Sequence, residues 1–201
     1  MVRPFETQAL YAWAKTQHLL LNNEEFTRTW KEAGAHHGME NDVYFNPTSQ
    51  RWWKRNSLMA SSHYLEFLQR IQLHNWIFPE TAMRLEGFTI DESEGATTAT
   101  ALLPVFSQPH VDAARGARPS EARRYLEGLG FEAYAHDQTD PDAEGNVNYH
   151  HPEIGIFIED LHDENVFIHP EPAPPIVVDP IIVFNPATKI DRLRAELAQD
   201  T

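Results

Sequence analysis

The chain of 201 residues contains no cysteine, and this absence excludes three kinds of site. Without thiols there is no disulfide framework, no cysteine nucleophile and no zinc–thiolate centre. No apolar run approaches the roughly 20 residues that a membrane-spanning helix requires. The N-terminal region also lacks the continuous apolar segment of a secretory signal. From these absences we expect a cytoplasmic protein without a membrane segment.

Positive charge is scarce as well. The chain has 16 Lys and Arg against 30 Asp and Glu, which gives a formal net charge of −14. Nucleic-acid binding draws its affinity from Lys and Arg on phosphates, so we expect no nucleic-acid partner. An anionic small molecule can still be held by one lysine and a metal ion. A hydrophobic fraction of 41% and this length predict a folded globular domain with a substantial core.

The first part of the chain is predicted to be helical. Residues 5–32 divide into two helical segments, and the first carries an apolar stripe at helical spacing. That stripe consists of Ala9, Leu10, Trp13 and Ala14. We interpret residues 1–32 as an N-terminal helical extension that packs on the domain over residues 33–201.

A glycine-containing turn and a β-hairpin follow the helical segments. Gly34 and Gly38 flank a pair of histidines, and residues 43–45 read as a strand. An Asn-Pro-Thr-Ser turn then precedes a returning strand over residues 51–54, which ends in Lys54. The pattern therefore predicts a hairpin whose last strand carries a lysine.

The next segments predict a helix and two strands. The helix starts at Ser61 or Ser62 and carries Glu66 near the border of its apolar stripe, which consists of Tyr64, Leu65, Leu68 and Ile71. Strands are expected over residues 83–90 and 98–106. The Ser-Gln-Pro sequence at 107–109 is interpreted as a chain reversal or hinge.

The second half of the chain predicts one clear helix among short strands. Residues 120–129 have helical periodicity, with Gly130 as a C-terminal stop. The remaining expectations are an exposed loop over residues 136–148, short apolar strands over 154–158, 166–168 and 176–182, and a charged amphipathic helix over 189–199.

The segment from Asp160 to Asn165 carries the strongest chemical signal. It has the form D-L-x-x-x-N directly after an apolar strand, and the later strand ends in Asp179. Phosphoryl transfer needs a carboxylate to accept the proton of the acceptor hydroxyl, together with amide and carboxylate oxygens that hold Mg²⁺ on the phosphates. A tight loop lets Asp160 and Asn165 point at one site, and a hairpin can bring Asp179 beside them.

With these parts in this order, the chain resembles a minimal protein-kinase-like fold. It is most similar to the kinase-like domain of polyvalent proteins from phages and conjugative elements. The D-L-H-x-x-N form is also similar to small-molecule kinases of the aminoglycoside and choline type. The stretches that carry the resemblance are 34–45, 51–54, Tyr64-Leu65 with Arg70, 75–87, 107–109, Gly130-Phe131, 160–165 and Asp179-Pro180.

The resemblance implies a role for each matched residue. Lys54 would hold the α- and β-phosphates of ATP and pair with Glu66, and Asp160 would be the catalytic base. Asn165 and Asp179 would be the Mg²⁺ ligands. The loop over the phosphates would contain Gly34 and Gly38. The adenine would be contacted by backbone groups of Ser107 and Gln108. These residues are expected to line one cleft between two lobes.

The sequence departs from the kinase pattern at four places, the first of which is that the segment with Gly34 and Gly38 does not have the form G-x-G-x-x-G. Ile158 and Glu159 stand where kinases have His and Arg, Pro180 follows the metal-binding Asp, and few residues follow Asp179. We therefore expect an α+β, two-lobe fold with a small antiparallel N-lobe sheet at about residues 33–106. A hinge at about 107–110 and a reduced C-lobe at about 111–201 complete it.

The leading functional hypothesis is ATP- and Mg²⁺-dependent phosphotransfer to an unknown hydroxyl acceptor, such as a protein Ser, Thr or Tyr or a small molecule. A pseudokinase, which binds nucleotide or protein without transfer, is the first alternative. The second is a metal-dependent hydrolase built from Asp and some of the 11 histidines, among them His36, His37, His150, His151, His162 and His169. No H-E-x-x-H spacing occurs, and dispersed histidines are more often solvated or hydrogen-bonded.

Overall fold

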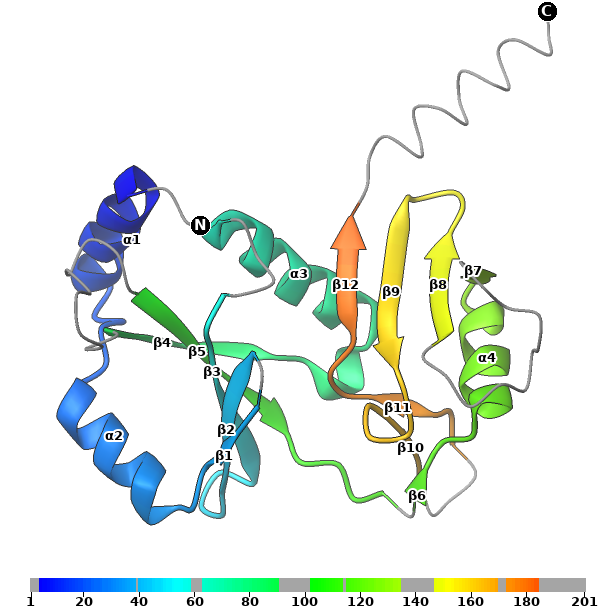
Figure 1. Ribbon diagram of the computed structural model, residues 1–201, viewed down its shortest axis with the longest axis horizontal. Coiled ribbons are helices and arrows are strands. Elements are labelled where there is room, and N and C mark those ends of the chain that lie inside the picture. Colours follow the sequence, from blue (N-terminus) through cyan, green and yellow to red (C-terminus); the bar gives the residue numbers. More distant parts are fainter. Residues whose placement is uncertain are drawn as a thin grey trace, which may run out of the picture. The chain divides into compact units, whose positions relative to one another are not determined.

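The computed structural model describes residues 4–38, 40–58, 63–90, 102–113, 115–134, 147–169 and 173–184. The chain divides into two compact units, the first ending at His110 and the second beginning at Val111 (Figure 1). Each unit combines helices with antiparallel sheets, which confirms the predicted α+β class. The helix expected over 189–199 lies outside the described residues. No helix within the described ranges is long and apolar enough to cross a membrane.

The first unit is built on a five-stranded sheet with the order β1-β2-β3-β5-β4. Its strands are β1 (His36–His37), β2 (Asn41–Asn46), β3 (Arg51–Asn56), β4 (Arg84–Ile90) and β5 (Leu102–Pro109). All strand pairs in the sheet are antiparallel. The β2–β3 hairpin confirms the predicted one, and it places Lys54 on a central strand.

Side-chain hydrogen bonds close the turn between β2 and β3. The Oδ1 atom of Asn46 accepts from the backbone N–H of Thr48 at 3.0 Å and from that of Ser49 at 3.1 Å. Asparagine favours such turns because its side chain can replace a backbone acceptor. The sequence alone therefore predicts this turn.

Of the two alternatives expected at residues 107–109, the chain reversal is wrong, whereas the hinge stays a prediction. Strand β5 continues to Pro109, with Ser107 paired to Trp53 of β3 on one side and to Arg84 of β4 on the other. Pairing on both sides keeps the backbone extended here. The proline stands at the end of the strand, where its missing N–H costs no ladder hydrogen bond.

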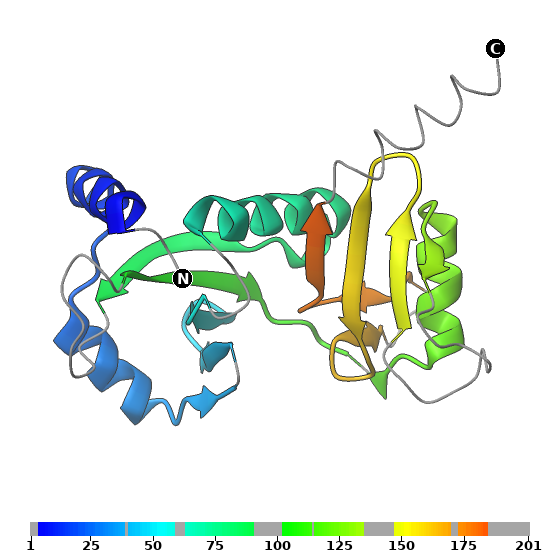
Figure 2. The ribbon, with the colours of Figure 1, turned by 45° about the horizontal axis from the view of Figure 1, so that its top comes forward.

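Helices cover both faces of this sheet (Figure 2). Helix α3 (Tyr64–Ile77), followed by the short 3-10 helix η1 (Pro79–Thr81), packs Phe67 against Phe106 of β5. Helix α2 (Asn23–Glu32) packs on the opposite face, where Trp30 contacts Tyr44 and Val105. Strand alternation explains the division, since Val105 and Phe106 point to opposite faces.

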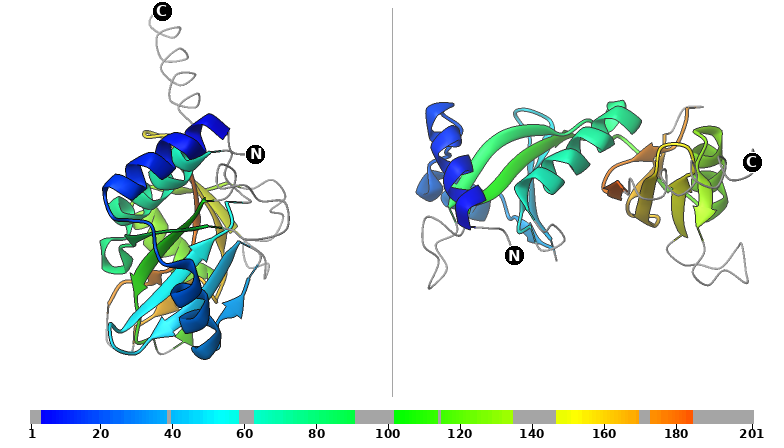
Figure 3. Two further views of the ribbon diagram at one scale, coloured as in Figure 1. Left: turned by 90° about the vertical axis from the view of Figure 1, so that its left-hand side faces the viewer. Right: turned by 90° about the horizontal axis from the view of Figure 1, so that it is seen from above.

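Helix α1 (Pro4–Thr16) lies with α2 at one end of the β4–β5 pair (Figure 3). The buried side chains of α1 include Thr7 and Ala14, and Ala14 is part of the core cluster that contains Phe67. Trp13 is 47% exposed and Ala9 is also exposed, so the predicted apolar stripe of this helix is wrong at these two positions. The residues interpreted as an extension thus contribute directly to the core of the first unit.

The segment between α1 and α2 pairs with the edge strand β4. The N–H of Phe88 donates to the Leu19 carbonyl at 2.8 Å, and the N–H of Leu21 donates to the Phe88 carbonyl at 2.9 Å. Gly87 permits this approach, because its φ is +153° and a Cβ there would overlap the Leu19 carbonyl oxygen. The connection therefore covers the outer edge of the sheet.

The start and the buried face of α3 differ from the prediction. The N-cap is His63, whose Nδ1 accepts from the Glu66 N–H at 3.1 Å, so the helix starts later than Ser61 or Ser62. Leu65 is 59% exposed, while Phe67 and His74 are buried. The buried face of α3 therefore carries Tyr64, Phe67 and His74. It is rotated about the helix axis relative to the predicted face, which included Leu65.

The second unit contains two small antiparallel sheets and one helix in its described part. One sheet has the order β12-β9-β8-β7 and the other β11-β10-β6. The elements are β6 (Arg115–Gly116), α4 (Pro119–Gly128), β7 (Glu132–Tyr134), β8 (Val147–His151), β9 (Ile156–Leu161), β10 (Val166–Ile168), β11 (Ile176–Val177) and β12 (Ile181–Phe184).

Two predictions for this unit need correction. The loop expected over 136–148 ends earlier, since Val147 already begins β8; residues 135–146 lie outside the described residues. The single run over 176–182 is divided into β11 and β12 because Pro180, which has no N–H, lies between them.

Helix α4 ends as predicted at Gly130, whose φ is +88°. The N–H of Phe131 donates to the Leu126 carbonyl and that of Gly130 to the Glu127 carbonyl, both at 3.0 Å. This pair of bonds satisfies the last carbonyls of a helix and favours glycine at the left-handed position. The helical periodicity of residues 120–129 predicts that Leu129 shares the buried face with Ala122 and Leu126, but Leu129 is 40% exposed.

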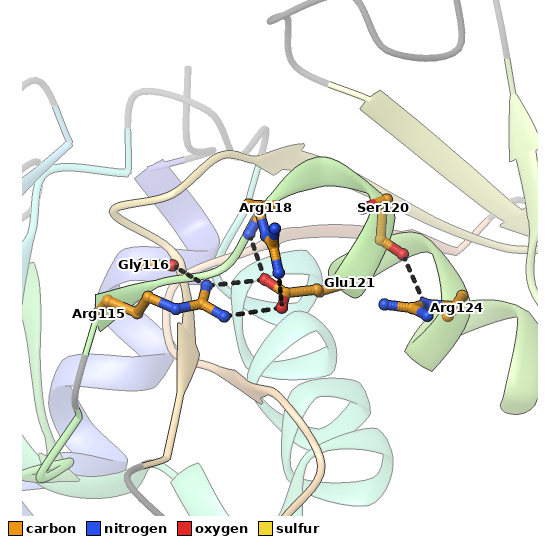
Figure 4. Close-up of polar contacts among 6 residues, drawn as sticks. All are labelled: Arg115, Gly116, Arg118, Ser120, Glu121 and Arg124. Carbon is orange, nitrogen blue, oxygen red and sulfur yellow. Dashed lines mark hydrogen bonds and ion pairs between the residues drawn. The ribbon is translucent and has the colours of Figure 1, made fainter.

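Two arginines tie β6 to the start of α4 (Figure 4). Both carboxylate oxygens of Glu121 accept from the Arg115 guanidinium at 2.7 Å, and Oε1 also accepts from Arg118 at 3.0 Å. Hydrogen bonds from Arg115, then from Arg118, hold the pKa of Glu121 well below its usual range. The carboxylate therefore stays ionised and keeps the strand beside the helix.

We predict that Tyr149 makes the protein sensitive to alkali. Tyr149 is 1% exposed, and its burial raises its pKa to about 12. The unfolded phenol ionises near pH 10, so the stabilisation is complete below about pH 10 and is lost as the pH rises toward 12. Urea unfolding measured from pH 9 to 11.5 should show a declining free energy of unfolding.

Tyr149→Phe should make that decline shallower, whereas the partly exposed Tyr11 serves as the control in Tyr11→Phe. Burial also raises the pKa of Tyr44 and Tyr64, so part of the decline should persist. An identical decline in Tyr149→Phe and wild type would contradict the prediction.

Candidate active site

Asp160 lies in a bulge of strand β9. Val147 of β8 faces Leu161, and Tyr149 faces Ile158. Between these pairs β8 has one residue, whereas β9 has two, Glu159 and Asp160. Asp160 has a φ of +62°, a left-handed conformation that Asp and Asn tolerate better than most residues. A bulge re-aims a side chain relative to the regular strand, and it does so here at the predicted base.

Asn165 fastens this bulge from the end of the following turn. Its Nδ2 donates to the Asp160 carbonyl oxygen at 2.8 Å and lies 3.3 Å from Asp160 Oδ2. The N–H of Asn165 donates to the His162 carbonyl at 3.0 Å, which closes the turn. Because the Nδ2 atom of Asn165 faces Asp160, its Oδ1 atom points away from Asp160.

His162 joins the same cluster. Its Nε2 lies 3.0 Å from Asn165 Nδ2 and 3.8 Å from Asp160 Oδ1. Its Nδ1 accepts from the Glu164 N–H at 3.3 Å. The imidazole therefore lies beside the side chains of Asp160 and Asn165, a contact that the sequence analysis did not predict.

Asp179 follows the β10–β11 hairpin, in which Val166 is paired with Val177. The N–H of Val178 donates to the Asn165 carbonyl at 2.9 Å, so Asp179 is one residue beyond a direct bond to Asn165. The fold thus brings the backbone of this segment to the Asp160–Asn165 turn. The side chains in this region carry carboxylate and amide oxygens, which are suitable ligands for Mg²⁺.

Gly116 of β6 lies directly against the turn that contains Asp163. The sequence analysis did not identify this residue. A Cβ at this position would overlap the Asp163 carbonyl oxygen and lie 2.9 Å from the Asp163 Cβ. Gly116 also faces Phe167 of β10. No motif marks this glycine, since its requirement arises from two segments that are distant in sequence.

Lys54 occupies β3 in the first unit and is 6% exposed. It faces Val43 of β2 and Phe106 of β5, and Phe106 packs against Phe67 of α3. Lys54 is therefore on the sheet face that carries α3. A lysine is rarely buried to this extent unless its amine is paired with another group.

Three aromatic rings gather on the same face of the sheet as Lys54. Trp52 is two residues before Lys54 and so points to the same side of β3, and Phe45 faces Trp52 across the hairpin. Trp52 Nε1 donates to His110 Nδ1 at 3.1 Å, and the rings of Phe45 and His110 are 5.1 Å apart. The sequence analysis did not predict the contact between Trp52 and His110.

Glu66 lies in the first turn of α3. Its Oε1 accepts from Arg70 at 3.1 Å, one helical turn later. Its backbone N–H is bound by the capping His63. The expected pairing of Glu66 with Lys54 stays a prediction.

The two glycines expected over the phosphates have different surroundings. Gly34, with a φ of +67°, ends α2: its N–H donates to the Lys31 carbonyl, and the Ala35 N–H donates to that of Trp30, both at 3.2 Å. Gly38 is in the turn between β1 and β2, where its N–H donates to the Asn41 carbonyl at 2.8 Å. A Cβ on Gly38 would come within 2.9 Å of that oxygen, so this turn requires glycine.

Ser107 and Gln108 are buried at the end of β5. The Ser107 carbonyl accepts from Arg51 at 2.9 Å, and its hydroxyl donates to Glu86 at 2.5 Å. Gln108 donates through Nε2 to the Thr81 carbonyl at 3.0 Å, and it lies past the last pair between β4 and β5. Recognition of the adenine of ATP by the backbone groups of Ser107 and Gln108 stays a prediction.

Three of the described histidines have local contacts with neighbouring side chains or backbone, which are of a structural kind. His151 packs edge-on against Phe131, His150 stacks on Phe157, and His74 contacts Thr81 through Nε2. Within the described ranges no three His, Asp or Glu side chains are grouped closely enough to hold a metal ion. The metal-hydrolase alternative therefore receives no support from this part of the chain.

The predicted site residues are divided between the two units. Lys54 and Glu66 belong to the first unit, and Asp160, Asn165 and Asp179 belong to the second. Within the second unit the fold gathers its members around one turn. The meeting of both groups in a single cleft stays a prediction.

A comparison with protein families gives one match. A family described as serine/threonine/tyrosine kinases found in polyvalent proteins matches residues 4–186, which include both units. No curated protein and no solved structure matches the chain. The match begins at the first residue of α1 and ends beyond β12.

We predict that Gly116→Ala destabilises the protein by displacing the turn at Asp163. Overpacking of this kind costs about 1–3 kcal/mol, which urea unfolding would detect. Gly128→Ala is the matched control, because a Cβ there has nothing within 4 Å and alanine suits a helix. A Gly116→Ala protein as stable as the Gly128→Ala control would refute this role.

Proposed function

Because this chain belongs to the family of serine/threonine/tyrosine kinases found in polyvalent proteins, we propose that it transfers the γ-phosphoryl group of ATP to a hydroxyl group, with Mg²⁺ as cofactor. In this proposal the first unit is the N-lobe and the second is a reduced C-lobe, joined at about residues 107–110. The acceptor is the hydroxyl of a protein Ser, Thr or Tyr, or of a small molecule.

The observation that carries the proposal is the bulge at Asp160, held by Asn165. A left-handed residue inside a strand is costly unless its surroundings fix it. Here the Asn165 amide donates to the Asp160 carbonyl at 2.8 Å. Strained residues of this kind are concentrated at functional sites, and a carboxylate aimed out of a strand suits a base.

In the proposed reaction Asp160 accepts the proton of the acceptor hydroxyl. The acceptor oxygen forms a bond to the γ-phosphorus, and the bond to the β–γ bridging oxygen breaks, so ADP leaves with the electron pair. Asn165 Oδ1 and the Asp179 carboxylate would hold Mg²⁺, which neutralises charge on the phosphates. The hydrogen bond from Val178 to the Asn165 carbonyl supports a shared position for these two ligands.

The nucleotide would lie along the α3 face of the first unit. Lys54 would contact the α- and β-phosphates, paired with Glu66, and the Gly38 turn would close over them. One strand step of two residues separates Lys54 from Trp52, about 6–7 Å along β3. The Phe45–Trp52–His110 cluster is therefore suitably located to contact the base, beside the backbone of Gln108.

A pseudokinase is the second candidate, and one observation favours it. Ile158 stands where kinases have a histidine that braces the catalytic loop, and it is fully buried between β8 and β12. An apolar side chain there cannot hydrogen-bond the loop. Asn165 and His162 would have to supply the bracing instead.

We predict that MgATP raises the melting temperature of the wild-type protein, because a ligand that binds the native state stabilises it. Lys54→Met should reduce the shift by removing the charge beside the phosphates. Asp179→Asn should selectively weaken its dependence on Mg²⁺. Thermal unfolding with ATP, with and without Mg²⁺, measures both effects.

Lys31→Met is the control, since Lys31 is exposed on α2. Equal shifts in wild type, Lys54→Met and Asp179→Asn would show that nucleotide binds elsewhere and would argue against the proposed site.

Asp160→Asn should separate an enzyme from a pseudokinase. The proposed base touches the acceptor and not the nucleotide, so the MgATP thermal shift should stay nearly intact. Phosphotransfer or slow ATP hydrolysis should fall about 10²–10⁴-fold, the usual contribution of a general base. ADP release measures this even with water as the acceptor.

Asp163→Asn provides the control, because Asp163 is exposed in the same turn and should retain wild-type turnover. If wild type binds MgATP but turns it over no faster than Asp160→Asn, the chain is a pseudokinase.

A further inference from the structure

The N-terminus of α3 is held by α1. An α-helix leaves its first N–H groups without helical partners. At α3 two successive groups are bound by side chains: Glu6 Oε1 of α1 accepts from the Leu65 N–H at 3.2 Å, and His63 accepts from Glu66. A carboxylate at this end is also favourable because the helix dipole is positive there.

A second contact from α1 reaches the same turn. Thr7 is 1% exposed and hydrogen-bonds the phenol of Tyr64, the first residue of α3. The Tyr64 hydroxyl in turn donates to the Leu102 carbonyl of β5 at 2.7 Å. Adjacent residues of α1 thus bind both the backbone and the side chain of the first turn of α3, and Tyr64 links that turn to the sheet.

Apolar packing continues this contact along α1. Ala14 is fully buried, and Leu10 and Tyr11 join the cluster that contains Phe67 and Phe106. Polar anchoring at one end and apolar packing along the helix leave α3 little freedom to slide or rotate on the sheet.

We propose that α1 is the element that positions α3 for phosphotransfer, with Glu6 and Thr7 as positioning residues. This inference rests on the proposed function, in which Glu66 must reach Lys54 for the phosphates to be held. Glu66 is one residue beyond the amide that Glu6 binds, so the position of Glu66 depends directly on the α1 contact. Kinase activity requires the equivalent lysine–glutamate pair to be in place.

Two features separate this role from simple packing. The family match begins at residue 4, so α1 belongs to the kinase unit itself. The polar anchors also converge on the single turn that carries Glu66, whereas the apolar contacts are distributed along the helix.

The test compares Glu6→Ala and Thr7→Val with Glu24→Ala in the full chain. Glu24 is likewise an acidic residue in a first turn, that of α2, but it is exposed, whereas Glu6 is partly buried. Amide hydrogen exchange at Leu65 and Glu66 should accelerate about three- to tenfold in Glu6→Ala, the equivalent of one hydrogen bond. At a temperature where every variant is folded, KM for MgATP should rise and kcat should fall by a similar factor.

Glu6→Gln retains an oxygen acceptor and should recover most of the lost turnover, which guards against misfolding of the alanine variant. The inference is overturned if Glu6→Ala and Thr7→Val exchange faster at α3 but retain wild-type KM and kcat, since α1 would then be structural alone. If wild type shows neither a MgATP thermal shift nor turnover, the proposed function itself fails, and this inference fails with it.

Discussion

The hydrogen bond from the Asn165 amide to the Asp160 carbonyl is the constraint on which the candidate catalytic centre depends. It fixes a left-handed residue inside β9, and that residue determines where the carboxylate points. Around it the turn is closed through His162, backed by Gly116 and joined to the Asp179 segment through Val178. Each of these contacts comes from a different strand or turn. The described part of the second unit therefore brings acidic and amide groups together through strands and turns.

The first unit depends on a different principle, the alternation of side chains along its strands. Lys54 and Trp52 share one face of β3 with α3, while Trp53 and Arg55 face α2 on the other. Arg55 pairs with Asp42 at 2.6 Å and lies over the rings of Phe26 and Trp30. The α2 face is thus closed by aromatic packing. The α3 face carries the buried Lys54, which is the residue proposed to hold the phosphates.

Much of the local structure was legible in the sequence, because it depends on nearby residues. Residues close together in the sequence determine four of these features. They are the Asn46 turn, the β2–β3 hairpin, the end of α4 before Gly130 and the hydrogen bond between Asn165 and Asp160. The burial of Leu65 was predicted wrongly because two apolar stripes fit α3 almost equally well, and contacts with Phe106 and Ala14 decide between them. The β9 bulge and the role of Gly116 could not be predicted, since strands far apart in sequence create them.

The pairing of Leu19 and Leu21 with Phe88 has a consequence for how the protein is made. The segment between the two N-terminal helices finds its partner only in β4, which is synthesised much later. Contacts between distant parts of a chain slow folding, because the loop between them must close first. The N-terminal helices therefore complete their packing late during translation. Until β4 and β5 emerge from the ribosome, the apolar sides of these helices lack the strands against which they pack.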